Sequence, residues 1–128
     1  MNRVVLDASA LLAILNDEPG AEKLTPQLLQ AATISTVNLA EVQGKLVTRG
    51  IDPDSAWEAA LSPIREAEPF TAEQARIVGS LIAQTGVLGL SLGDRACLAL
   101  AIVLKAPVYT ADRLWKNLRL GIRIHVVR

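Results

Sequence analysis

Residues 4–15 read VVLDASALLAIL, and the hydrophobic pattern changes at the single charged residue in this stretch. Residues 3–6 form a short run rich in β-branched side chains, which is typical of a strand buried on both faces. Residues 8–15 are apolar over a length that suits a helix. The sequence therefore predicts a strand that ends at Asp7 and leads directly into a helix.

Apolar runs of strand length and of helix length alternate along the rest of the chain. This alternation predicts one α/β domain over residues 1–128, with a mostly parallel sheet of about five short strands and helices on both faces. The other predicted strands cover residues 33–35, 68–70, 107–109 and 122–127. The other predicted helices cover residues 21–31, 37–48, 71–85, 91–104 and 111–118, with one more that begins at Asp52-Pro53 and breaks near Ser62.

Composition excludes several classes of protein. The chain has 13 Lys and Arg, 13 Asp and Glu, 51% hydrophobic residues and one cysteine, Cys97. Disorder and a disulfide scaffold are therefore excluded, and zero net charge argues against coating nucleic acid by bulk electrostatics. Polar residues and glycines interrupt the uncharged run 77–93, so we expect no membrane span and a cytoplasmic protein.

Four carboxylates are placed where the ends of the predicted elements meet. Asp7 follows the first strand and Asp112 closely follows the strand at 107–109, while Glu41 and Asp94 lie near the starts of two helices. Because parallel strands have their carboxyl ends at one edge of a sheet, we expect the four to converge there. Each acid taken alone also has a simpler explanation, since a carboxylate near a helix start commonly caps it.

The surroundings of these acids favour a cation. Two carboxylates about 4 Å apart repel by roughly 4 kcal/mol at an effective dielectric near 20, so a cluster needs positive charge to offset it. Oxygen ligands without a His or Cys cluster suit a hard ion such as Mg²⁺ or Mn²⁺. Such an ion orients a phosphate, lowers the pKa of a bound water and stabilises a leaving oxygen, which indicates phosphodiester hydrolysis.

Four segments that carry these acids also resemble a known family. They read VLDASAL at 5–11, NLAEV at 38–42, LSLGDRACLALA at 90–101 and YTADR at 109–113. In this order they resemble PIN-domain ribonucleases of the VapC toxin type, over residues 4–124. The resemblance implies a PIN-like three-layer α/β/α fold and a metal-dependent endoribonuclease that a cognate antitoxin holds inactive.

The resemblance also implies roles for individual residues. Asp7 and Asp94 would be direct ligands of Mg²⁺ or Mn²⁺, while Glu41 and Asp112 would hold metal-bound water or a second ion. Small hydroxyl residues that orient such a site match Ser9 and Thr110. A homodimer or a toxin–antitoxin hetero-oligomer is expected, with the antitoxin lying in an apolar groove, for which the candidate contacts are Leu11, Leu12 and Leu15. Ordinary core packing is the alternative for these leucines.

Basic residues near the end of the chain are candidates for contact with RNA. Arg113, Lys116 and Arg119 are spaced by three, so they can share one helical face, and a solvated face is the alternative. Arg95 follows a candidate ligand and is placed either to hold a phosphate or to pair with the acidic region 50–75. A protein-binding PIN-like module without catalysis remains the competing function.

Overall fold

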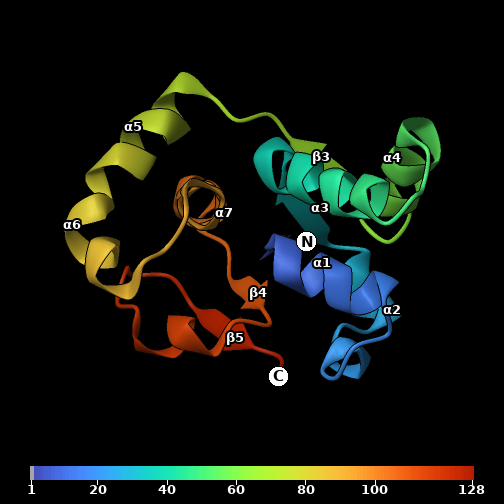
Figure 1. Cartoon of the computed structure of the whole chain (residues 1–128). Helices are drawn as coiled ribbons and strands as arrows, with labels where there is room; N and C mark the ends of the chain where they lie inside the picture. Colours follow the sequence, from blue (N-terminus) through green and yellow to red (C-terminus); the bar gives the residue numbers. More distant parts are fainter. Residues whose placement is uncertain (1) are drawn as a thin grey trace.

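The computed structural model describes residues 2–128 and is built around a five-stranded parallel sheet. The strands are β1 (Val4–Leu6), β2 (Ala32–Ser35), β3 (Glu66–Glu68), β4 (Val108–Thr110) and β5 (Ile124–Val126). They lie in the order β3-β2-β1-β4-β5, and all four pairings are parallel (Figure 1). The chain passes from β1 to one side for β2 and β3, and later returns to the other side for β4. The reversal lies beside β1 and β4, the position where open parallel sheets bind ligands.

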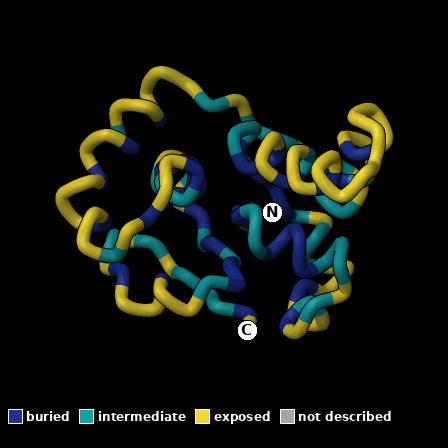
Figure 2. The backbone as a smooth tube through the Cα atoms, viewed as in Figure 1, coloured by how far each residue is buried: buried dark blue, intermediate teal, exposed yellow. Residues whose placement is uncertain are grey.

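Helices cover both faces of the sheet, which confirms the predicted α/β/α architecture. Successive strand residues point to opposite faces, so Val5 packs with Leu98 of α7 (Leu92–Leu104). Leu6 packs instead with Ala10 of α1 (Ala8–Leu15). Buried residues concentrate in the strands and in the inner sides of α1 and α7, as Figure 2 shows. Within residues 2–128, no helix combines the length and apolar character that a bilayer crossing requires.

The remaining helices pack around α1 and α7. They are α2 (Pro26–Leu29), α3 (Thr36–Thr48), α4 (Pro53–Leu61), α5 (Ala72–Ser80) and α6 (Ile82–Thr85), with 3-10 turns η1 (Ala21–Lys23), η2 (Gly86–Leu88) and η3 (Arg113–Asn117). α3 lies against both α4 and α7 and so connects the two halves of the molecule. The sequence prediction was accurate for α1, α3 and α7. It was also accurate for α4, which begins after its N-cap residue Asp52 and ends at Leu61, next to the predicted break near Ser62.

The predicted helix at 21–31 is wrong. The chain forms η1, then a cap at Thr25, then the single turn of α2. Pro26 supplies no backbone N–H and disfavours helical geometry at the residue before it, so a continuous helix cannot pass through this point. The predicted helix at 111–118 is likewise shorter and tighter, because only η3 forms there, behind Asp112 as its cap.

The edges of the sheet also differ from the prediction. The strand predicted at 68–70 lies two residues earlier, because Glu66 and Glu68 align with Thr33 and Ser35 of β2. Arg3 forms ion pairs with both glutamates, which accounts for an edge strand with so little apolar character. The helix predicted at 71–85 is interrupted at Leu81, and the last strand spans only Ile124–Val126.

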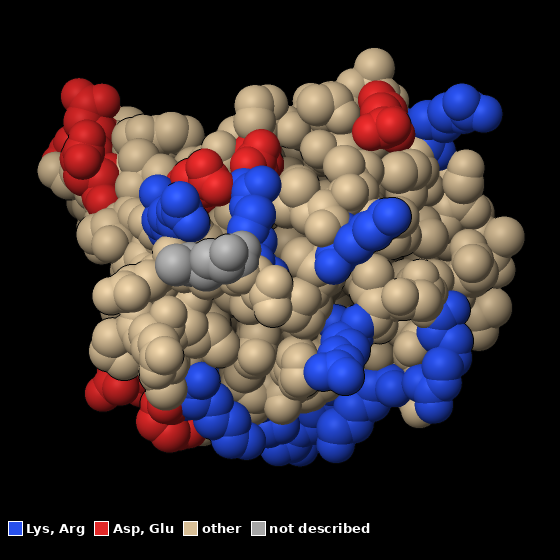
Figure 3. All heavy atoms as spheres, turned by 180° about the vertical axis from the view of Figure 1, so that it is seen from behind, with Lys and Arg blue, Asp and Glu red and all other residues tan. Residues whose placement is uncertain are grey.

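Zero net charge conceals an uneven distribution of charge. After Asp94 the sequence has seven Lys and Arg residues and only one acid, Asp112. In the view from behind, a band of Lys and Arg follows the lower edge of the molecule, while Asp and Glu gather mainly elsewhere (Figure 3). The surface therefore offers distinct basic and acidic regions to other molecules.

Leucine substitutions in α7 test its packing on the sheet. Leu98 is fully buried, whereas Leu92, the first residue of the same helix, is 59% exposed. Leu98→Ala is expected to lower the free energy of unfolding by about 2–5 kcal/mol, because it leaves a cavity in the core. Leu92→Ala should change it by less than about 0.5 kcal/mol. Urea denaturation followed by circular dichroism measures both, and equal losses would contradict this placement of α7.

Candidate active site

A cleft of about 390 Å³ opens at the carboxyl edge of the sheet. Its lining includes all four carboxylates singled out in the sequence, Asp7, Glu41, Asp94 and Asp112. They come from four separate elements: the end of β1, the second turn of α3, the first turn of α7 and the start of η3. Asp7 is buried, Asp94 and Asp112 are half-buried, and Glu41 is exposed, so the cleft deepens toward the sheet.

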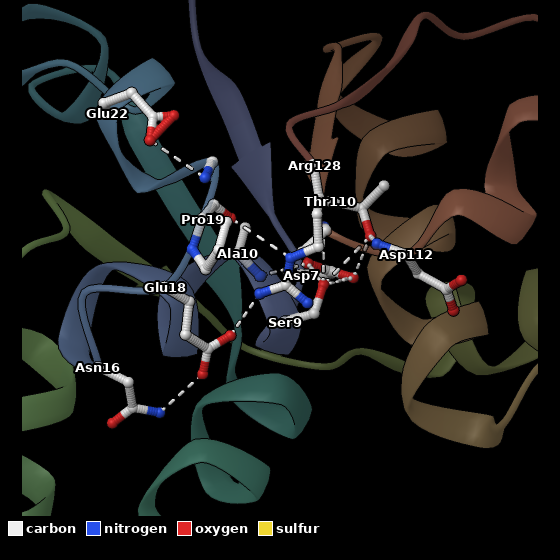
Figure 4. A network of polar contacts seen from close by, with 12 residues as sticks. Asp7, Ser9, Ala10, Asn16, Glu18, Pro19, Glu22, Thr110, Asp112 and Arg128 are labelled. Carbon is white, nitrogen blue, oxygen red and sulfur yellow. Dashed lines mark hydrogen bonds and ion pairs between the residues drawn. The ribbon is translucent and has the colours of Figure 1, made fainter.

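Asp7 is held by hydrogen bonds from two adjoining elements (Figure 4). The backbone N–H of Ala10 and the hydroxyl of Ser9 each donate to Asp7 Oδ1 over 2.8 Å. The hydroxyl of Thr110, the last residue of β4, donates to Asp7 Oδ2 over 2.6 Å. Ser9 and Thr110, the two hydroxyl residues that the family resemblance named, therefore hold the carboxylate at the junction of β1 and β4.

Burial changes the acidity of Asp7. Its side chain is almost inaccessible to water, and this desolvation raises its pKa from 3.8 to about 6. The hydrogen bonds from Thr110, Ala10 and Ser9 oppose the rise, while the charge of Asp94 adds to it. The ionised form of Asp7 is thus costly, and a nearby cation would relieve that cost.

Asp94 and Asp112 also act as helix caps. Asp94 Oδ2 accepts from the backbone N–H of Ser91 over 3.0 Å, and the Ser91 hydroxyl accepts in return from the N–H of Asp94. Asp112 Oδ1 accepts from the N–H of Leu114 over 2.9 Å. Each carboxylate uses one oxygen in its cap, and within residues 2–128 the other oxygen accepts no hydrogen bond. Capping and a place in the cleft are therefore compatible for the same residue.

Glu41 is positioned by α3 and α7 together. Helix α3 begins behind Ser35, so Asn38 lies inside the helix rather than capping it. The Asn38 side-chain amide donates to Glu41 Oε1 and to the carbonyl oxygen of Gly93, each over 2.9 Å. A Cβ on Gly93 would overlap the Glu41 carboxylate, so a larger residue there would displace this carboxylate from its present position. The three residues form one contact between the helices.

The donor set of the cleft fits a hard divalent cation. All four carboxylates offer oxygen ligands, and the cleft supplies no histidine or cysteine. Within residues 2–128, however, no three His, Cys, Asp or Glu side chains are already arranged around one point for an ion. Asp7 is fixed by its hydrogen bonds, whereas Glu41 is exposed and Asp94 and Asp112 each keep one oxygen out of their caps.

A family model and several solved structures match this chain. The model of the PIN domain matches residues 4–119. The chain belongs to the PIN-domain family.

The fold of this PIN domain is shared with proteins of toxin–antitoxin systems. A DNA-bound VapBC structure from Salmonella typhimurium has a TM-score of 0.75 and 18% identity, with 100% of both chains covered. VapC20 of Mycobacterium tuberculosis, a sarcin-ricin loop cleaving toxin, has a TM-score of 0.74 and 18% identity, covering 94% of this chain and 98% of that one. VapBC2 of Rickettsia felis, bound to a promoter DNA fragment, has a TM-score of 0.73 and 21% identity over 98% of each chain. No curated protein is significantly similar to the chain in sequence.

The basic residues selected from the sequence fall in different places. Arg113 lines a second hollow that adjoins the cleft. Arg95 turns away and donates to the carbonyl oxygen of Val78, so it packs α7 against α5. Lys116 and Arg119 line neither hollow, and the guanidinium of Arg119 donates to the carbonyl oxygens of Lys116 and Leu118.

The leucines of α1 serve mainly as core. Leu11 is fully buried between α1, α3 and α4, and Leu12 is 7% exposed. Leu15 is partly buried against the same cluster. Leu12 also lines the acidic cleft, so it places apolar surface directly beside the carboxylates.

Sequence reasoning missed several residues of this region. Lys45 and Arg49 line the cleft from α3, and Glu18 lines it from the turn after α1. The spacing of four between Glu41, Lys45 and Arg49 could have indicated a shared helical face. Nothing in the local sequence indicates that Gly93 lies against Glu41, because that contact depends on how two helices cross.

The raised pKa of Asp7 predicts a pH dependence of stability. Between about pH 4 and pH 6 the folded state binds more protons at Asp7 than the unfolded state, so this group stabilises the fold below pH 4 and its contribution is lost as pH rises to 6. Urea denaturation in EDTA should show Asp7→Asn gaining roughly 3 kcal/mol relative to the natural chain between pH 4 and pH 7. A difference that does not vary with pH would contradict this account.

Proposed function

We propose that residues 1–128 act as one PIN domain that cleaves RNA internally with a bound Mg²⁺ or Mn²⁺ ion, as the toxin of a toxin–antitoxin pair. One observation carries the proposal. Four carboxylates from four separate elements, Asp7, Glu41, Asp94 and Asp112, line a single cleft at the reversal point of the sheet. PIN nucleases generally use divalent metal ions, and the oxygen donors of this cleft suit such ions.

The proposed division of labour is the one that the resemblance to PIN-domain ribonucleases implies. Asp7, which is held by Ser9, Ala10 and Thr110, and Asp94, in the first turn of α7, are the proposed direct ligands. Glu41 and Asp112 also line the cleft and are proposed to orient water or a second ion. When bound, the ion would polarise the phosphate, activate water and stabilise the leaving oxygen.

The fixed geometry around Asp7 supports this chemistry. Hydroxyl groups of Ser9 and Thr110 donate to its oxygens and thereby set which lone pairs face the cleft. Residues that orient ligands in this way commonly affect metal affinity by about 10–100-fold when they are changed. The low exposure of Asp7 also keeps bulk water from the floor of the cleft, which strengthens the local electrostatics.

The proposed partners are RNA and a cognate antitoxin protein. Several structures with this fold are described as VapBC or toxin–antitoxin complexes, which supports an antitoxin partner and a cytoplasmic site of action. A homodimer or a hetero-oligomer with the antitoxin is part of the same proposal. Leu12 and Leu15 remain proposed antitoxin contacts, because both retain some accessible surface. Leu11 has none in this structure and would support that surface from beneath.

Replacing Asp94 tests the proposed reaction. Asp94→Asn keeps an oxygen for the helix cap but removes a charged ligand, so RNA cleavage should fall by more than about 100-fold. The assay is cleavage of a panel of structured and single-stranded RNAs by purified protein in Mg²⁺, in Mn²⁺ and in EDTA. Asp54→Asn, on the exposed start of α4, is the matched control and should cleave normally.

Two outcomes would contradict the proposal. Cleavage retained by Asp94→Asn would remove this residue from the reaction. No cleavage by the folded natural chain on any RNA, together with no binding of Mn²⁺, would favour a PIN-like module that binds proteins without catalysis.

Gly93 offers a second test, through the position of Glu41. Gly93→Ala places a methyl group where the Glu41 carboxylate now lies, so Mn²⁺ affinity should fall by about tenfold or more. Gly44 lies on the same helix as Glu41, and a Cβ added there meets no neighbouring atom. Gly44→Ala should therefore bind Mn²⁺ normally and be slightly more stable than the natural chain. Calorimetric titration measures both affinities, and equal affinity in the two variants would show that the position of Glu41 does not matter for the ion.

A further inference from the structure

Basic side chains lie on two sides of the carboxylates. The acidic cleft is also lined by Lys45 and Arg49 of α3. A second hollow of about 570 Å³ is lined by Arg113 and Arg128, and it shares Ser9 and Asp112 with the first. The two hollows therefore meet at the acidic centre, and each is also lined by two basic side chains.

On the first side, the cations continue a stripe that begins at Glu41. Residues 41, 45 and 49 are four apart, so their side chains lie on one face of α3, with about 6 Å of helix axis between successive members. Lys45 and Arg49 are both exposed. The stripe leads from a proposed metal-site acid outward along the cleft, changing from negative to positive charge.

On the second side, Arg113 begins η3 directly after Asp112. It is exposed and makes no ion pair within residues 2–128, as is also true of Lys45 and Arg49. Charges that have no internal partner and border one groove are available to a polyanion. A run of phosphates is the ligand that matches cations on both sides of a metal-ion site.

Polar contacts hold two of the four cations in place. Arg49 Nη1 donates to Asn16 Oδ1 over 2.9 Å, and Asn16 Nδ2 donates to Glu18 Oε2 over 3.1 Å. Glu18 Oε1 in turn forms a 2.5 Å ion pair with Arg128 (Figure 4). This chain of contacts connects an arginine of one hollow to an arginine of the other, and it lowers the entropy lost when both bind a ligand.

We propose that these four cations form a track for the backbone of single-stranded RNA across the acidic centre. Lys45 and Arg49 contact phosphates in the first hollow, and Arg113 and Arg128 contact phosphates in the second, with the acidic centre where the two hollows meet. Single-stranded RNA fits better than a paired helix. Asp7 is buried at the floor of the cleft, and the backbone of an unpaired strand can enter the cleft more readily than a duplex can. The track rests on the proposed nuclease function and names the residues that hold its substrate.

The test measures binding without cleavage. Fluorescence anisotropy with a labelled single-stranded RNA in EDTA, over a range of salt concentrations, gives the affinity and its salt dependence. Lys45→Gln and Arg113→Gln should each weaken binding by about tenfold. Each should also reduce the slope of log affinity against log salt by about 0.7, the value for one lost phosphate contact on a single strand. The double variant should show both losses combined, because Lys45 and Arg113 line different hollows and share no contact.

Two further variants separate charge from structure. Arg123→Gln removes an exposed arginine before β5, at the opposite edge of the sheet from the acids, and should leave affinity and slope unchanged. Lys45→Arg keeps the positive charge and should retain affinity. Urea denaturation of every variant identifies any loss that comes from unfolding.

The outcomes distinguish the track from the nuclease. If the natural chain cleaves and binds RNA but the Lys45→Gln and Arg113→Gln variants match Arg123→Gln, the track is overturned and the nuclease stands. If Lys45→Arg loses as much affinity as Lys45→Gln, charge is not the reason and the track is also overturned. If the natural chain neither binds nor cleaves RNA, the proposed function fails and the track fails with it. For RNA cleavage in Mg²⁺ or Mn²⁺, the track predicts that the Lys45→Gln and Arg113→Gln variants have a raised KM and a kcat little changed from that of the natural chain.

Discussion

The burial of the Asp7 carboxylate between β1 and β4 is the constraint on which the site depends. A charged group at the centre of a parallel sheet is expensive, and an apolar residue there would stabilise the fold better. Hydrogen-bond donors offset this cost: Ser9 and Ala10 at the start of α1, and Thr110 at the end of β4. The same hydrogen bonds that make the charge tolerable also fix the start of α1 and the end of β4. A functional demand and a structural one are therefore met by one set of atoms.

Helix capping explains how carboxylates from distant parts of the chain come to face one cleft. A cap residue lies just outside its helix, with its side chain turned back toward the first turn. Asp7 and Asp112 are such caps, while Asp94 lies in the first turn of α7 and completes the cap of Ser91 by accepting its backbone N–H. In a parallel α/β fold, helices that follow strands begin at this edge. Capping is thus the local mechanism that gathers the acids, and it does not compete with their place in the cleft.

The extent to which sequence predicted the molecule follows from which interactions are local. β1, α1 and α7 could be predicted because their apolar residues adjoin strong cap residues, Asp7 and Ser91. The position of β3 could not, because pairing with β2 and the ion pairs of Arg3 decide it. The four acids could be placed at one edge because strand direction determines where strands end. Lys45 could not be assigned to the cleft, since its place there depends on how α3 packs against α7.

The central position of β1 has a consequence for the order of events during synthesis. Asp7 emerges from the ribosome early, yet the hydroxyl that satisfies it belongs to Thr110, 103 residues later. A nascent chain that already contains Asp7, Glu41 and Asp94 still lacks β4 and β5, so β1 is at the edge of its sheet and Asp7 lacks the donor from Thr110. Contacts so distant in sequence tend to form slowly. The acidic cleft is therefore complete only once β4 lies beside β1, and a chain that ends before β4 carries three of the acids without the full set of donors to Asp7.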